Sequence, residues 1–262
     1  MAAGMILVQQ RYQSPNAARQ AELERCREIN GGLATFARVD LVDGAAKRWT
    51  FADFFRLAAE RYAGEICVLA NSDIAFDESI ALAGPLAERG ALVALSRWDD
   101  SAAPSMEGRV AGEGWHFFSH SQDVWVFKAG GVPSFPADIQ LGIPQCESRL
   151  AYEAAAAGMI VVNPALSIRA WHHHASAVRT WRRKDGHRGP LLFPRLTTVE
   201  VVEPEALVVE RLGRFWKRET VVRLSGRPGA LALELAEKAA DRQKKSLKIG
   251  LRSPFYFRER RP

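Results

Sequence analysis

Apolar runs typical of buried strands recur along this chain of 262 residues, between helical segments, and they limit the folds that the chain can adopt. Residues 65–71 (EICVLAN) are almost entirely apolar, which is typical of a strand covered on both faces of a parallel sheet. Further strand-like runs stand at 5–10, 35–42, 91–96, 124–129, 159–164 and 166–171. Helix-like segments separate most of them. This alternation predicts an α/β fold, in which helices sandwich a mostly parallel sheet.

Helix signals support this interpretation. Thr50 followed by Asp53 resembles a capping box that opens a helix reaching to about residue 62. Asp77 is expected to cap a helix that Pro85 interrupts. Gly158 is expected to close a further helix that begins at residue 146. A polar helix is also expected at 16–29.

The pattern changes in two places. Residues 98–121 are rich in Asp, Ser, Gly and Pro and predict a long loop, which in a compact domain is usually functional or disordered. Beyond about residue 185 the alternation weakens, although a helix is plausible at 230–248. We therefore predict a domain over 1–185 and a C-terminal extension over 186–262.

The positive charge is concentrated at one end of the chain. The last 22 residues carry eight Lys or Arg and two acids, a balance of +6, and the whole chain is also +6, so residues 1–240 are formally neutral. This neutral body argues against a nucleic-acid-binding surface on the fold. The aromatic, basic segment 241–262 suits an anionic membrane surface or nucleic acid, and a solvated terminus is equally compatible with it.

The cysteines and the apolar runs limit the class of protein further. Three widely spaced cysteines without a CxxC pair argue against a disulfide framework and against a cysteine-based zinc site, and they indicate a reducing, cytoplasmic compartment. No apolar stretch reaches the length of a membrane-spanning helix. The absence of GxGxxG after the first strand, of GxxxxGK[ST] and of HExxH argues against dinucleotide dehydrogenases, P-loop NTPases and zinc hydrolases of the HExxH type.

Polar residues follow the buried strand at 65–70, as Asn71-Ser72-Asp73, and Asp77 comes one short turn later. Ligands of open α/β sheets bind beyond the carboxyl ends of the strands, where carboxylates suit a divalent cation and the phosphates it carries. Alternatively, both acids make only an Asx-turn and a helix cap. A helix needs one cap, so we expect Asp77 to be the cap and Asp73 to be the ligand.

Two further carboxylates are candidates for acid–base chemistry. Glu147 stands at the start of the helix in GIPQCESR, where the helix end favours its charged form, and it could act as a general base. An ordinary first-turn glutamate would give the same pattern. Asp123 directly precedes the strand at 124–129 and is the second candidate; a loop residue or cap is its alternative.

Three consecutive histidines follow the strand-like segment 166–171. In an extended chain His172 and His174 point to the same side, so they could supply one metal ligand and one phosphate contact. Arg179 and Arg182 are close enough in sequence to pair with a diphosphate.

Together, the strings LANSDIAFD, ALSRW, SQDVWVF, LGIPQCESR, AGMIVVNPALSI and WHHHASAVR resemble GT-A-type glycosyltransferases. More narrowly, they resemble a family of bacterial and viral glycosyltransferases. The resemblance covers about residues 5–182. It implies a GT-A-like, Rossmann-like sheet that binds a nucleotide sugar, followed by a basic C-terminal extension.

The resemblance also implies roles for individual residues. Asn71-Ser72-Asp73 takes the place of the acidic motif that binds the donor and its Mn²⁺ or Mg²⁺, with Asn71 replacing the first acid. Glu147 takes the place of the catalytic base, with Asp123 as second choice. His172 or His174 is the late metal-binding histidine. Arg19, Arg97 and Arg179 are expected to bind the nucleotide sugar. Arg19 and Glu22 also match an R-x-x-E-L motif, and the resemblance does not specify the function of that motif.

The expected activity is transfer of a sugar from a nucleotide-diphosphate donor to a glycan or lipid-linked acceptor. The neutral body and basic segment 241–262 fit an enzyme on the inner face of a membrane. A nucleic-acid partner is not expected. Two alternatives stay open: a non-catalytic module that binds sugar nucleotides, suggested by Asn71, and a nucleic-acid-binding protein that uses the basic segment.

Overall fold

The computed structural model describes residues 4–44, 47–99, 118, 121–176, 178, 181–182, 185–200, 204–211 and 217–252. Side chains are described for all of these residues except 211, 217 and 244–252. Most of the loop predicted at 98–121, the candidate residue Arg179 and most side chains of the basic segment 241–262 therefore lie outside the described part of the chain.

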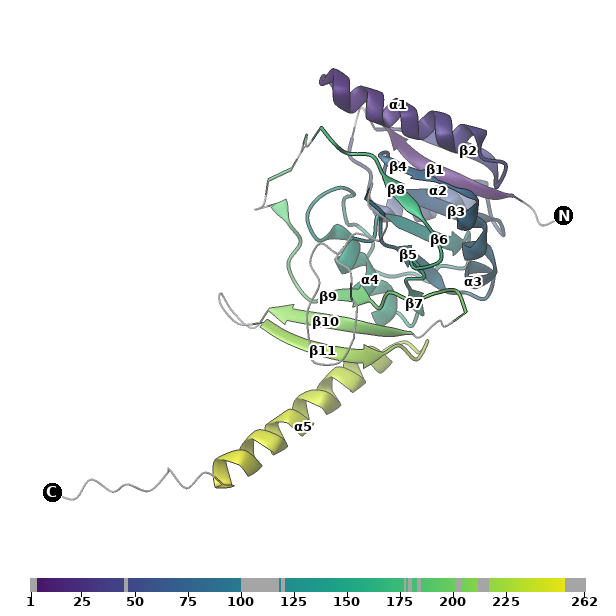
Figure 1. Ribbon diagram of the computed structural model, residues 1–262. Helices are drawn as coiled ribbons and strands as arrows, with labels where there is room; N and C mark the ends of the chain where they lie inside the picture. The colour runs from purple at the N-terminus through teal and green to yellow at the C-terminus, as the bar shows by residue number, and fades with distance from the viewer. Residues whose placement is uncertain are drawn as a thin grey trace.

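A six-stranded sheet forms the centre of the protein, in the order β2-β1-β3-β6-β5-β7 (Figure 1). Its strands are β1 (Met5–Arg11), β2 (Phe36–Asp43), β3 (Ile66–Ala70), β5 (Leu92–Leu95), β6 (Val124–Lys128) and β7 (Val161–Val162). Neighbouring strands are parallel except at β6, which runs antiparallel to both β3 and β5. The mostly parallel sheet predicted from the sequence is therefore confirmed, with one reversed strand.

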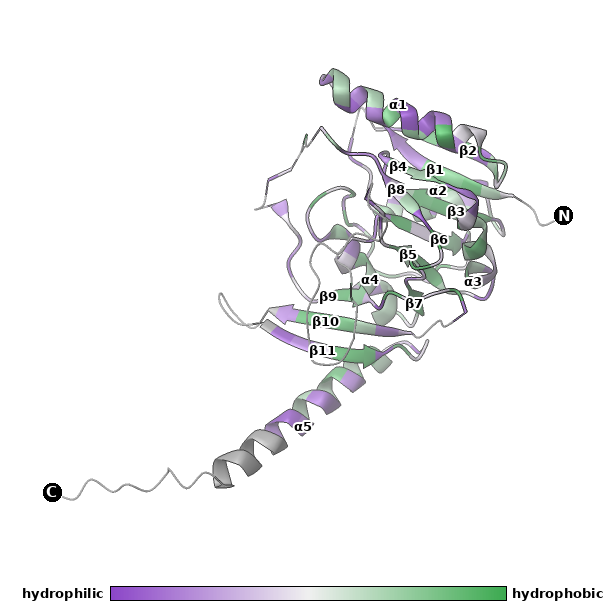
Figure 2. Ribbon diagram, viewed as in Figure 1, coloured by the Kyte–Doolittle hydropathy of each residue, from purple (hydrophilic) through white to green (hydrophobic). Residues whose placement is uncertain are grey.

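Helices cover both faces of this sheet because alternate strand residues face opposite layers. Leu69 and Trp125 belong to the core cluster beneath α2 (Phe51–Arg61) and α4 (Cys146–Ala156). Val68 and Val93 belong to the opposite cluster, with side chains of η1 (Glu78–Ala83) and α3 (Gly84–Glu88). Helix α1 (Ala17–Gly32) lies against β2 and the short strand β4 (Ile74–Phe76). The predicted sandwich is confirmed, and Figure 2 shows its strands to be largely hydrophobic.

The helix ends follow the sequence signals. The Thr50 hydroxyl accepts from the Asp53 backbone N–H, and the Asp53 carboxylate accepts from the Thr50 backbone N–H, which completes the predicted capping box. Asp77 caps the next helical segment by accepting from the backbone N–H of Ser79 at 2.9 Å. Pro85, which lacks an N–H, stands in the first turn of α3, so the segment divides there into a 3₁₀ helix and a short α-helix.

The strand predicted at 166–171 is largely wrong. The chain turns after Pro164, whose carbonyl accepts from the N–H groups of Ser167 and Ile168. Strand β8 (Ala170–His172) forms only beyond this turn and pairs antiparallel with β4, outside the central sheet. The apolar residues at 166–171 therefore serve a turn and a short strand.

The C-terminal part of the chain contains three antiparallel strands and a long helix. These elements are β9 (Leu191–Pro194), β10 (Glu205–Arg211), β11 (Lys217–Arg223) and α5 (Ala230–Arg252). Leu192, Val208 and Leu231 lie in the same core cluster as the residues beneath α2 and α4. Helix α5 then extends away from the body (Figure 1). The domain boundary at 185/186 stays a prediction, and none of the described helices has both the length and the apolar composition needed to cross a membrane.

Two buried polar side chains hold the turn between β3 and β4. Asn30, fully buried on α1, donates to the carbonyl of Ile74 at 2.9 Å and accepts from the N–H of Phe76 at 3.0 Å. Gln9 on β1 donates to the carbonyls of Asn71 and Ile74 at 2.9 and 3.2 Å. These bonds satisfy main-chain groups on both sides of Asp73, so they fix the turn that carries this residue.

We expect Asn30→Ala to lower the free energy of unfolding by about 1–3 kcal/mol, because it leaves buried donors and acceptors without partners. Denaturant unfolding followed by circular dichroism measures this change. Glu28→Ala, on the exposed face of the same helix, is the control and should stay within about 0.5 kcal/mol of the wild type. Equal stabilities of the two variants would contradict this role of Asn30.

Candidate metal centre

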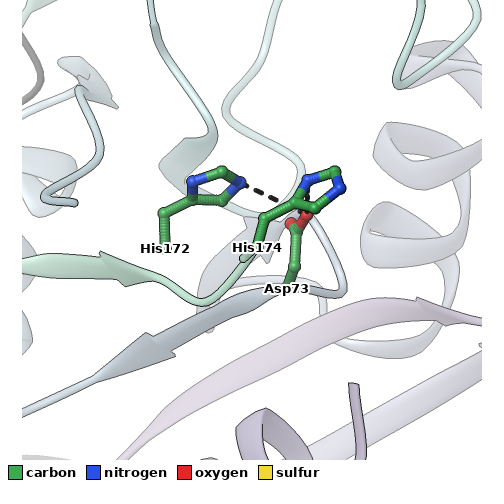
Figure 3. Close-up of side chains that lie close together, drawn as sticks. All are labelled: Asp73, His172 and His174. Carbon is green, nitrogen blue, oxygen red and sulfur yellow. Dashed lines mark ion pairs between the residues drawn. The ribbon is translucent and has the colours of Figure 1, made fainter. Parts of the chain in front are cut away.

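The side chains of Asp73, His172 and His174 lie close together and could hold a metal ion (Figure 3). One ligand atom of each residue lies within 4.8 Å of the other two. The main chain produces this arrangement: Ile74 is the register partner of His172, and the N–H of His173 donates to the carbonyl of Asp73 at 2.9 Å. Pairing of β4 with β8 thus brings together two segments that are far apart in the sequence.

Each imidazole presents one nitrogen to Asp73 and the other to a second oxygen. Nε2 of His172 is 3.4 Å from Oδ2 of Asp73, and its Nδ1 is 3.1 Å from Oδ1 of Asp99. Nδ1 of His174 is 3.5 Å from the same Asp73 oxygen, and its Nε2 is 3.1 Å from the carbonyl of Val178. Both sides of each ring face a hydrogen-bond acceptor, so a ring can donate on both sides only in its charged form. With a metal held by the inner nitrogens and Asp73, the outer nitrogens would carry the protons and donate to Asp99 and to the carbonyl of Val178.

The acid of this group is nearly buried and charged. Asp73 is 8 % exposed. Burial alone would raise the pKa of Asp73, but hydrogen bonds from His172 and His174 and the charge of Arg19 outweigh it and hold the pKa well below its usual range. For His172 burial has the opposite effect and alone would lower the pKa. The hydrogen bond to Asp73 and the negative charge of Asp73 outweigh it and hold the pKa of His172 above its ordinary value. The donor set is thus one carboxylate and two imidazoles, which suits a divalent transition metal.

Arg19 neutralises part of this charge. Its Nη2 donates to Oδ2 of Asp73 at 2.6 Å and to the hydroxyl of Tyr12 at 3.3 Å. Its Nη1 donates to Oε2 of Glu22 at 3.0 Å and to the carbonyl of His173 at 3.4 Å. Arg19 is therefore a buried neighbour of the triad.

A second polar network adjoins the triad through Asp99. Nε of Arg97 is 3.3 Å from Oδ1 of Asp99, and Nη1 of Arg97 is 3.4 Å from Oδ2 of Asp123. Asn71 donates from Nδ2 to Oδ1 of Asp123 at 2.7 Å. Asp123 can join this network because β6 is antiparallel, which places the start of β6 at the edge where β3 and β5 end.

Glu147 lies at the same edge, in the first turn of α4. Helix α4 leads into β7, which is parallel to β5, so the helix begins where the strands end. Burial and the nearby charge of Asp123 raise the pKa of Glu147 to about 7, against the opposing charge of Arg97. A carboxyl group that titrates near neutral pH is suited to general base catalysis.

The other residues predicted for the site are Ser72, Arg179 and Arg182. The hydroxyl of Ser72 donates to the carbonyl of Gln10, so it supports the turn and is turned toward β1. Arg179 lies outside the described residues. Arg182 is described, and its backbone N–H donates to the carboxylate of Asp185 at 2.7 Å.

Sequence reasoning did not single out Asp99 and Ser176. Asp99 stands within the predicted loop 98–121, although its position just beyond the strand at 91–96 was a usable signal, because that strand ends at the same edge as 65–70. Ser176 follows the histidines and binds Glu22, a contact that depends entirely on the packing of α1.

We expect Asp99→Ala to weaken Mn²⁺ binding by about 10–100-fold, the usual effect of losing the acceptor that orients a ligating histidine. Isothermal titration calorimetry measures the affinity. Asp138→Ala removes an exposed aspartate outside this network and serves as the control, with unchanged affinity expected. If Asp99→Ala bound Mn²⁺ as tightly as Asp138→Ala, the orientation of His172 by Asp99 would be unimportant.

The fold and the triad define an α/β protein with a candidate metal centre at the carboxyl edge of a mostly parallel sheet. No protein-family model matches the chain, and no curated protein matches it in sequence.

Proposed function

We propose that this protein is a metal-assisted glycosyltransferase that moves a sugar from a nucleotide-diphosphate donor to a glycan or lipid-linked acceptor. One observation carries the proposal: a triad able to hold a metal and a carboxyl group with a pKa of about 7 lie at the same edge of the sheet. The contacts Asp123–Arg97–Asp99 lead from the triad to Asp123, whose charge acts on Glu147. Such an edge is where ligands of open α/β folds bind.

The donor set favours Mn²⁺ over Mg²⁺. Two imidazoles and one carboxylate suit a first-row transition metal, whereas Mg²⁺ prefers oxygen ligands in an octahedral arrangement. Three protein ligands would leave coordination positions for oxygens of a diphosphate. When bound, the metal would neutralise negative charge on the departing nucleoside diphosphate.

Glu147 is the better candidate for the base. Both carboxylate oxygens of Asp123 already accept from Asn71 or Arg97, so Asp123 acts on Glu147 through its charge. In a direct displacement, Glu147 takes the proton of the acceptor hydroxyl while that oxygen bonds to the anomeric carbon. The bond from the anomeric carbon to the diphosphate oxygen breaks, and the electron pair leaves with the diphosphate.

The acceptor is proposed to lie at an anionic membrane surface, because the excess positive charge is confined to residues 241–262. Removing these residues should release the protein from anionic vesicles and leave nucleotide binding unchanged. Vesicle co-sedimentation, with neutral phosphatidylcholine vesicles as the control, measures this change. Undiminished binding of the truncated protein to anionic vesicles would contradict the proposed membrane contact.

A non-catalytic sugar-nucleotide-binding module is the second candidate. Asn71 stands where the resemblance places the first acid, and its amide donates to Asp123. Asp73 is therefore the one carboxylate of the triad. Binding of a donor without any turnover is the property that would distinguish this module from an enzyme.

The test is incubation of the protein and Mn²⁺ with UDP-, GDP-, CDP- and dTDP-sugars, with simple glycan and lipid-linked acceptors present. The proposal expects release of nucleoside diphosphate from one donor class, above the rate of a matched Asp73→Asn sample. Donor binding without release would favour the binding module. Failure to bind any donor would contradict both candidates.

A further inference from the structure

We propose that Glu22 is a positioning residue for the metal centre, because it fixes the chain segment that carries His172 and His174. This inference rests on the metal centre of the proposed function and is independent of the sugar donor. It gives a role to one of the two residues of the R-x-x-E-L motif.

Glu22 holds Ser176 with both of its carboxylate oxygens. Oε1 accepts from the backbone N–H of Ser176 at 2.7 Å, and Oε2 accepts from the Ser176 hydroxyl at 2.8 Å. The Glu22 side chain is 15 % exposed, so these bonds are largely shielded from water. A carboxylate that accepts two bonds from one residue fixes both the position and the orientation of that residue.

The same turn of α1 also contacts Asp73, the third member of the triad. Arg19 and Glu22, three residues apart on one helix face, are joined by a 3.0 Å contact between Nη1 and Oε2. Arg19 in turn donates to Asp73 at 2.6 Å. One helical turn therefore contacts both the β3–β4 turn, which carries Asp73, and the chain beyond β8, which carries His174.

His174 depends on this contact more than His172 does. His172 is the last residue of β8, where the pairing with β4 and the bond from its N–H to the carbonyl of Trp98 hold the main chain. His174 lies beyond the strand, two residues before Ser176. Loss of the Glu22–Ser176 bonds should therefore free the His174 side of the site first, and leave the fold in place.

The experiment compares Mn²⁺ affinity and the Co²⁺ absorption spectrum of Glu22→Gln with those of the wild type. Glutamine keeps the size of the side chain, but it offers one acceptor oxygen and places an amide against Arg19 or Ser176. We expect Mn²⁺ affinity to fall about 10–100-fold and the Co²⁺ ligand-field bands to change, with the fold retained by circular dichroism. A purely structural role would change the melting temperature without changing the Co²⁺ spectrum.

Two further variants make the test specific. Glu24→Gln is the matched control, since Glu24 is exposed on the same helix and binds Gln20; it should leave both readouts unchanged. Ser176→Ala removes one of the two bonds to Glu22 and should weaken Mn²⁺ binding less than Glu22→Gln does. If Glu22→Gln did not fold, an unchanged affinity and Co²⁺ spectrum in Ser176→Ala would overturn the proposal.

The outcomes separate this inference from the proposed function. Wild-type affinity and an unchanged Co²⁺ spectrum in folded Glu22→Gln would overturn the positioning role alone. Failure of the wild type itself to bind Mn²⁺ or Co²⁺ would overturn the metal centre and, with it, both the positioning role and the metal-assisted mechanism.

Discussion

Replacing Asp73 with asparagine should weaken Mn²⁺ binding at least about 100-fold, because it removes the carboxylate that faces both inner imidazole nitrogens. Asparagine preserves the volume of the side chain, so the effect reports on charge and ligand type. Calorimetric titration of Mn²⁺ measures the loss. Asp77→Asn is the matched control, because Asp77 is four residues away and caps η1.

The same substitution should also destabilise the protein. Arg19 and Asp73 form a nearly buried ion pair, with side chains 6 % and 11 % exposed. Removing Asp73 leaves Arg19 with Glu22 as its remaining charged partner, so the cost should stay below the about 3–5 kcal/mol of a fully unpaired buried charge. Metal titrations of Asp73→Asn therefore need circular dichroism at the same temperature. A folded variant that kept wild-type Mn²⁺ affinity would contradict the assigned ligand.

Replacing Glu147 with glutamine should lower the turnover number about 10²–10⁴-fold and leave donor affinity unchanged, because glutamine cannot take a proton from the acceptor. Initial rates of nucleoside diphosphate release, together with calorimetric donor affinity, separate the two effects. Glu153→Gln is the control on the same helix, since Glu153 pairs with Arg149. Full turnover by Glu147→Gln would exclude it as the base.

The pH profile gives an independent test of this role. Burial and the charge of Asp123 raise the pKa of Glu147 to about 7. A base acts in its deprotonated form, so the turnover number should rise with pH, reach half of its maximum near the pKa of about 7 and level off at higher pH. Asp123→Asn removes a neighbouring negative charge, which lowers the pKa of Glu147 and should move the rise to lower pH. A rise that did not move in Asp123→Asn would contradict the coupling.

The sequence predicted which segments form buried strands better than it predicted the directions in which those strands run. Apolar runs such as 65–71 and 124–129 show that a strand is buried, and burial is what the sheet confirms. The same runs are silent about strand direction, because an apolar residue packs equally well in either orientation. The reversal of β6 therefore had to come from the structure, and it explains why Asp123 lies at the site although it precedes a strand.

The candidate site was predictable where it depended on local sequence. Asp73 follows a buried strand, and alternation along an extended chain put His172 and His174 on one side. Their meeting depends on the register of β4 with β8, a long-range pairing that short-range patterns do not encode. The contacts of Asp99 with His172 and of Glu22 with Ser176 depend on tertiary packing in the same way.

The most direct test of the central claim is calorimetric titration of UDP, GDP, CDP and dTDP into the wild type and Asp73→Asn, with and without Mn²⁺. We expect that one diphosphate binds the wild type, that this binding requires Mn²⁺, and that Asp73→Asn abolishes it. Absence of binding under every condition, or equal binding without metal and in the variant, would contradict a metal-assisted nucleotide site.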